Sequence, residues 1–157
     1  MAASVGGWLV DHSDIPREQV HRIDTRREDP ATDYAEQLRQ TLEWREKGHD
    51  RLDFVLLGLE EDASVGTLLA GWPTPRGPAL VSTVGRHPSA RIGLAAHMLS
   101  AARFVGIIAT GTRLRATVAR LALSGADPFE LPVLGLRPIG GELRWYLDAA
   151  ACPQPGE

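Results

Sequence analysis

The loop from Gly58 to Gly71 is the first place where this sequence could do chemistry, because acidic and small residues there follow directly on an apolar run. The run, Phe54 to Leu57, has no polar residue within it, as is typical of a parallel strand covered on both faces by helices. Ligands of such sheets bind just beyond the carboxyl ends of the strands. Whether this chain does chemistry therefore depends on the acidic loop, in which Asp62 could instead cap the loop or a helix.

Basic residues form a second candidate group. Arg113 and Arg115 follow Gly111 at the predicted start of a helix, a setting that attracts anions, and a solvated basic helix face is the alternative. His87 lies in a later loop and could supply an imidazole as general base, or be a plain surface histidine. No His, Cys, Asp or Glu residues repeat at liganding intervals, so we expect no metal, and we expect no cofactor.

The composition is that of an ordinary globular protein. Its 157 residues are 43% hydrophobic and 24% charged, which suits one domain with a core. We assign residues 1–152 to that domain and residues 153–157 to a mobile tail. The net charge of −3 gives no basic bias for nucleic acid, and no run reaches the roughly 18 apolar residues of a membrane span. The single cysteine, Cys152, fits a reducing compartment, so we expect a cytoplasmic protein that binds neither nucleic acid nor membrane.

Strands alternate with helices along the chain, which predicts an α/β domain, a three-layer Rossmann-like fold with a mostly parallel sheet and helices on both faces. Asp29-Pro30 predicts the start of a helix over residues 30–46, with Asp29 as N-cap. The remaining elements are a short helix at 3–12, extended segments at 20–23, 79–84, 91–94, 104–109 and 131–136, and helices at 95–102 and 114–121.

Four blocks in the same order resemble the 6-phosphogluconolactonase family, relatives of glucosamine-6-phosphate deaminase. IPREQVHRID with DPATDYAEQLRQTL looks like the family segment that precedes its central strand. LDFVLLGLEED resembles the strand ending in LLGMGPDGHTASLFPG, and RIGLAAHMLSAARFVGIIATG resembles RITLTLPVLNAARHVVFLVTG. LPVLGLRPIGGELRWYLDAAA is similar to the closing strand and final helix. The resemblance implies a family fold that is truncated at its N-terminal side.

The resemblance also implies which residues form the site. The family loop Gly-x-Asp-Gly-His-Thr carries a histidine that activates water against the lactone carbonyl. Gly58 and Asp62 match family residues of this loop, but Ser64 stands at the position of the histidine. A serine hydroxyl does not replace an imidazole as general base unless another base lies beside it. Arg91 matches the arginine of the family's RITLT block, and Arg115 stands where a phosphate-facing lysine is usual.

The family domain begins with an earlier stretch that carries a Gly-Gly-Ser/Thr phosphate loop and an Asp-Glu-Arg motif, and this sequence shows neither. Loss of a general base typically costs 10²- to 10⁴-fold in rate. We therefore expect a degenerate lactonase-like domain of the pentose phosphate pathway, with weak or no hydrolysis of 6-phosphogluconolactone. Two alternatives stay open: an active hydrolase that uses a substitute base such as His87 or a partner chain, and a non-catalytic sugar-phosphate-binding, scaffold or regulatory subunit.

Absence of the earlier strands would leave one edge of the sheet bare. Bare edges pair readily with another chain, because their N–H and C=O groups lack partners. We therefore expect a homo-oligomer, or a partner chain that covers the exposed edge.

Overall fold

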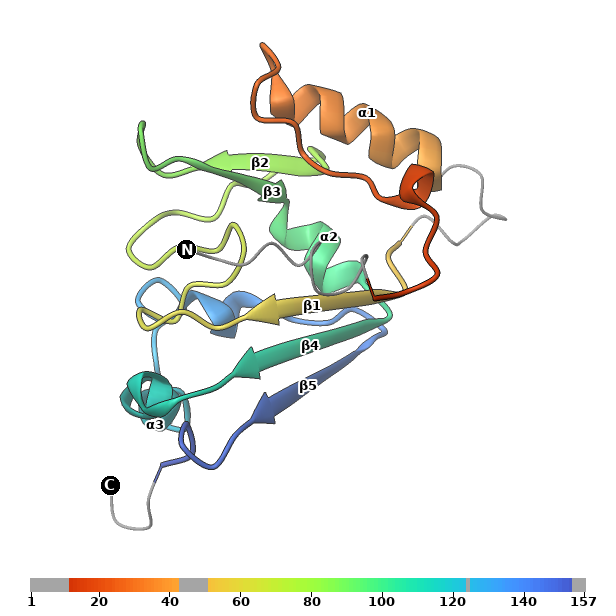
Figure 1. Cartoon of the computed structure of the whole chain (residues 1–157). Helices are drawn as coiled ribbons and strands as arrows, with labels where there is room; N and C mark the ends of the chain where they lie inside the picture. The colour runs from red at the N-terminus through yellow and green to blue at the C-terminus, as the bar shows by residue number, and fades with distance from the viewer. Residues whose placement is uncertain (1–11, 43–50, 124, 154–157) are drawn as a thin grey trace.

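The computed structural model describes residues 12–42, 51–123 and 125–153 (Figure 1). Its main sheet has three parallel strands in the order β1-β4-β5, namely β1 (Phe54–Gly58), β4 (Phe104–Ala109) and β5 (Glu142–Leu147). A separate antiparallel pair joins β2 (Val81–Val84) to β3 (Arg91–Leu94). The parallel sheet and its connecting helices confirm the predicted α/β class.

The helices are α1 (Pro30–Leu42), α2 (Ala96–Ala101) and α3 (Arg115–Leu121), with short 3-10 turns at η2 (Arg17–Gln19), η3 (Thr112–Leu114) and η4 (Pro132–Gly135). Asp29 caps α1 as predicted: its Oδ1 accepts the Thr32 N–H at 3.1 Å and its Oδ2 accepts the Thr32 hydroxyl at 2.7 Å. These hydrogen bonds lower the pKa of the Asp29 carboxyl. The helix packs through Ala35 and Leu38 on Val81 of the β2–β3 pair.

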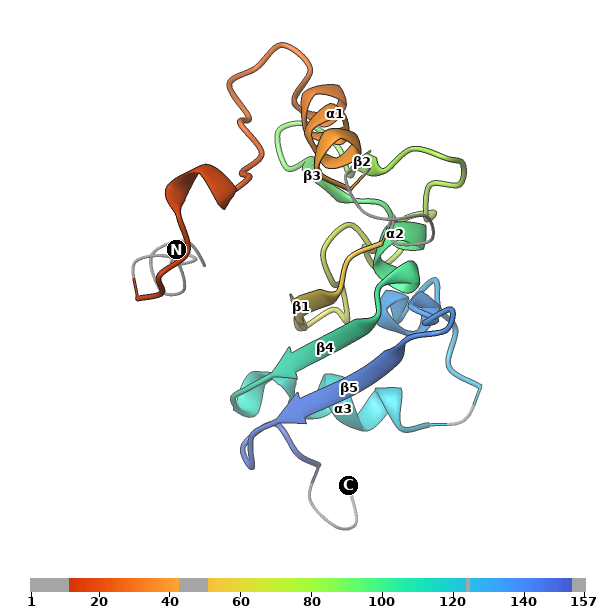
Figure 2. The same cartoon turned by 90° about the vertical axis from the view of Figure 1, so that its right-hand side faces the viewer.

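The main core lies on one face of the three-stranded sheet. Val55, Val105 and Ile107 point to this face and pack with residues from α2, the Gly58–Gly71 loop and the η4 segment; their partners include Leu68, Leu99, Leu131, Val133 and Leu136. Figure 2 shows the η4 segment on one side of the sheet and, on the other, the arm formed by residues 12–29, which stands apart from the strands.

The opposite face of the sheet is open. The side chains of Phe54 and Leu56 are 59% and 53% exposed, and Tyr146 on β5 is 46% exposed. The expectation that the first strand is covered on both faces is therefore wrong for the part of the chain that the structure describes. A run of apolar residues predicts burial of both faces, but it cannot show whether this chain supplies the second layer.

The end of the chain also differs from the prediction. Residues 131–136 form the buried turn η4, not a strand: Val133 N–H donates to the Ala63 carbonyl at 3.2 Å, and Leu134 N–H donates back to Leu131. The closing strand is instead β5, so the ELRWYLDAAA stretch, where a final helix was expected, forms β5 and then the turns at residues 149–151. The Asp148 carboxylate ends β5 by accepting the N–H groups of Gly111 and Ala151. An apolar run that does not alternate with polar residues can be a buried turn as well as a buried strand, so the sequence pattern did not distinguish the two.

The other predicted elements agree closely with the structure. The strand at residues 104–109 is confirmed at its predicted bounds. In the segment predicted to be extended at 20–23, Val20 is extended, but the segment pairs with no strand of the described residues. Three predictions fall outside the described residues, wholly or in part. They are the helix at 3–12 except for its last residue, the last four residues of the helix at 30–46, and nearly all of the predicted tail. No helix within 12–42, 51–123 and 125–153 has the length and apolar character that crossing a bilayer requires.

Candidate functional site

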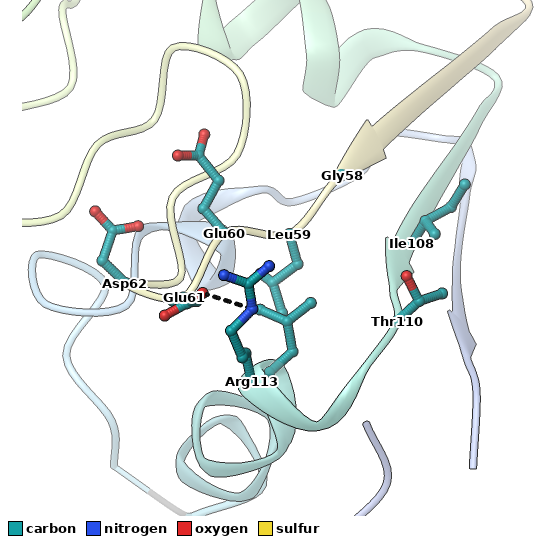
Figure 3. Close-up of a pocket in the computed structure, with 9 residues that line it drawn as sticks. Gly58, Leu59, Glu60, Glu61, Asp62, Ile108, Thr110 and Arg113 are labelled. Carbon is teal, nitrogen blue, oxygen red and sulfur yellow. Dashed lines mark ion pairs between the residues drawn. The ribbon is translucent and has the colours of Figure 1, made fainter. Parts of the chain in front are cut away.

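A pocket of about 570 Å³ opens beyond the carboxyl ends of β1 and β4, where ligands of parallel sheets bind (Figure 3). Residues that continue from β1 form one wall, and residues that follow β4 form the other. The lining consists of Gly58, Leu59, Glu60, Glu61, Asp62, Ile108, Thr110, Arg113 and Leu114. Of the residues predicted from the sequence, Gly58, Asp62 and Arg113 therefore come together here.

The loop after β1 is held by its own backbone in a tight turn. Ala63 N–H donates to the Glu60 carbonyl at 2.9 Å, and Glu60 N–H donates to the Ser64 carbonyl at 3.0 Å. Ala63 has a φ of 64°, which lies in the left-handed region that favours glycine. The family that this sequence resembles has glycine at the matching position. The Thr117 hydroxyl on α3 donates to the Glu61 carbonyl and fixes the loop to that helix.

Ser64 is fully buried, with 0% of its surface exposed. Its hydroxyl oxygen accepts the Ala70 N–H at 3.0 Å, and its own N–H donates to Asp62 Oδ1 at 2.9 Å. Ser64 is also absent from the residues that line the pocket. The hydroxyl thus stabilises the loop from inside, and Asp62 acts as a cap for the same turn.

Arg91 and Arg113, two of the predicted site residues, are each paired with a glutamate of the loop. Arg91 donates through both terminal nitrogens to the Glu60 carboxylate, one of these bonds measuring 2.8 Å to Oε2. These hydrogen bonds raise the pKa of the Arg91 guanidinium. Arg113 Nε lies 3.4 Å from Glu61 Oε1, and Figure 3 shows its side chain reaching from η3 across the pocket to that carboxylate.

The remaining predicted residues lie elsewhere. Arg115 Nε donates to the Ala150 carbonyl at 3.1 Å and so ties α3 to the C-terminal turn. His87 is exposed in the turn between β2 and β3 and does not line the pocket. α3 has only seven residues, and its first turn follows η3 without a side-chain cap.

The sequence reasoning did not single out Glu60 and Glu61 as site residues. The sequence did contain an indication, because these two glutamates stand where the family that this chain resembles has Gly and Pro in its GPDGHT loop. With Asp62 they place three carboxylates beside two guanidinium groups, so the pocket carries a net negative charge. Among the described residues, no three metal-ligating side chains are placed to hold a metal ion. As it stands, the pocket repels a phosphate dianion more than it attracts one.

The parallel sheet, the crossover helices and the pocket at the strand ends define a Rossmann-like α/β domain. Known structures support this fold: a crystal structure of devB protein matches with a TM-score of 0.80 at 23% identity, covering 93% of this chain and 63% of that chain. The structure of 6-phosphogluconolactonase from Thermotoga maritima matches with a TM-score of 0.71 at 20% identity, covering 90% of this chain and 62% of that chain.

Sequence comparison identifies the family. The profile of glucosamine-6-phosphate isomerases/6-phosphogluconolactonase matches residues 3–145, so the chain belongs to this family. The 6-phosphogluconolactonase of Nostoc sp. is 34% identical over 148 residues, covering 92% of this chain and 61% of the relative. The human 6-phosphogluconolactonase is 31% identical, covering 91% of this chain and 57% of the relative. The chain thus spans about three fifths of the length of these relatives.

Proposed function

We propose that this chain is a 6-phosphogluconolactonase-like domain of the pentose phosphate pathway, cytoplasmic, whose isolated form hydrolyses 6-phosphogluconolactone weakly or not at all. Membership of the family supports the substrate class. The burial of Ser64 supports the loss of activity, because the side chain at the position of the family histidine is turned into the protein and bonded to Ala70. On this proposal the chain by itself is a pseudoenzyme.

Hydrolysis of a lactone requires a base that takes a proton from water as the oxygen adds to the carbonyl carbon. Among the described residues that line the pocket, only carboxylates could perform this task. Glu60 and Glu61 are held in ion pairs, and Asp62 accepts a backbone N–H of its own loop. His87 does not line the pocket, so it is poorly placed to act as the substitute base.

We expect the purified chain to show no lactone hydrolysis above the spontaneous rate. The measurement is proton release from 6-phosphogluconolactone at increasing protein concentration, with the full-length Nostoc relative as positive control. A rate that rises in proportion to the concentration of this chain, and that Asp62→Asn abolishes, would contradict the proposal and favour an active hydrolase.

A second candidate function is sugar-phosphate binding without turnover. Arg113, which lines the pocket, and Arg91, which is paired with the lining residue Glu60, favour it. Their pairing with Glu60 and Glu61 predicts that anion affinity is suppressed. Replacing both glutamates with glutamine should therefore tighten binding of 6-phosphogluconate about tenfold, since exposed ion pairs contribute up to about 1 kcal/mol each. Calorimetric titration measures the affinity.

Glu130→Gln is a matched control for this prediction, because Glu130 also lies near an arginine, with 4.0 Å between its Oε2 and Arg120 Nη2, but does not line the pocket. It should leave the affinity unchanged. Arg91→Ala added to the double variant should remove most of the gain. Equal affinities in the wild-type chain and the double variant would show that the glutamates do not block the site.

A further inference from the structure

The outer edge of β1 has unpaired backbone groups. Phe104 N–H donates to the Asp53 carbonyl at 3.1 Å, and Leu59 N–H donates to the Ile108 carbonyl at 2.8 Å, so the odd-numbered residues of this strand face β4. Backbone groups alternate sides along a strand, and those of Phe54, Leu56 and Gly58 therefore point to the outer edge. Within the described ranges these groups have no hydrogen-bond partner.

A groove of about 260 Å³ runs along this edge. One wall is β1 itself, and the other consists of apolar or small residues, so the groove suits the side chains of an added strand; the lining includes Leu52, Phe54, Val55, Leu56, Leu57, Gly66, Thr67, Leu94 and Leu99. An edge with free N–H and C=O groups beside an apolar groove is the arrangement that binds an extended polypeptide by strand addition.

The open face of the same sheet continues from this edge. The Phe54 and Phe104 rings stack with their centroids 4.9 Å apart, and Leu56 and Tyr146 lie next to them over Gly106. Several of these large side chains are about half exposed. Contiguous apolar surface of this kind is typical of an interface. None of residues 12–29, the arm on this side of the sheet (Figure 2), is buried.

The edge and the face restrict what can bind. The edge requires a strand, and the face requires a layer that packs on aromatic and aliphatic side chains. A second copy of this chain could pair its own β1 with this edge, but the apolar faces of both copies would then stay uncovered. The family relatives carry more chain than this: 39% of the Nostoc protein lies outside the 61% that this chain spans.

We propose that the β1 edge and the open face together bind the part of the family domain that lies beyond the stretch this chain spans. A strand of that part pairs with Phe54, Leu56 and Gly58, and a helix covers Phe54, Leu56 and Tyr146. The proposal concerns assembly and stands whether or not the assembled domain hydrolyses a lactone.

The test is co-expression of the full chain with the unmatched 39% of the Nostoc relative as a separate polypeptide. We expect a one-to-one complex by size-exclusion chromatography with light scattering. Hydrogen exchange at the amides of Phe54, Leu56 and Gly58 should slow at least tenfold on assembly. The amides of Val55 and Leu57, which already face β4, serve as internal controls and should change little.

Leu56→Lys should prevent the complex, whereas Leu123→Lys should not, because Leu123 is 67% exposed but lies at the end of α3, away from the edge. Circular dichroism of both variants checks that the fold is kept. The proposal is overturned if no complex forms, if the two lysine variants behave alike, or if the three edge amides exchange unchanged in the complex. A homodimer of this chain that protects the same amides would assign the surface to a second copy instead.

Discussion

Replacing Gly141 with alanine is expected to lower the free energy of unfolding by about 3 kcal/mol or more, as overpacked backbone contacts do. A β-carbon at this position would lie 2.2 Å from the Ala102 carbonyl oxygen and 2.9 Å from that of Arg103. Both contacts are with backbone, which cannot swing aside as a flexible side chain can. The adjacent hydrogen bond, from Glu142 N–H to the Arg103 carbonyl at 2.9 Å, starts the pairing of β5 with β4 and would be lost first.

Thermal unfolding monitored by circular dichroism measures this effect, and for a domain of this size we expect the Tm to fall by about 10 °C. Gly135→Ala is the matched control, because a β-carbon there meets no atom within 4 Å. It should shift the Tm by only a degree or two. Equal Tm values for the two variants would mean that β5 does not depend on the close approach at Gly141.

Replacing Ser64 with histidine, the residue of the matching family position, is expected to destabilise the chain by about 3 kcal/mol without producing lactone hydrolysis. The larger side chain must enter a fully buried position, which typically costs about 1–3 kcal/mol. It also removes the acceptor of the half-buried Ala70 N–H, and a donor left without a partner costs about 1 kcal/mol or more. The imidazole would lie inside the loop and away from the pocket, which Ser64 does not line.

Ser64→Ala separates the two contributions, because it removes the hydrogen bond without adding volume. Urea unfolding of both variants should show alanine costing about 1–2 kcal/mol and histidine clearly more. The hydrolysis assay described above, applied to the folded fraction of Ser64→His, is the functional measurement. A clear gain of hydrolysis would show that this position faces the pocket and that one substitution removed the activity.

Elements with strong local signals could be predicted from the amino-acid sequence. Asp29 followed by Pro30 fixed the start of α1, because a side-chain acceptor and a preset φ act within one turn. Unbroken apolar runs identified β1 and β4 as strands, although the structure buries only one face of β1. The four ordered blocks identified the family, which the family profile confirms.

What covers each surface, and which charged side chains pair, depends on how distant segments pack together. Residues 131–136 are apolar throughout and form a buried turn, whereas β5 contains Glu142 and Arg144 and forms the closing, largely exposed strand. Glu60 and Arg91 are 31 residues apart, and the pair exists only because the strand β3 is brought beside the loop after β1. Such pairing depends on the arrangement of whole elements in space, so the side-chain pattern of either segment cannot encode it.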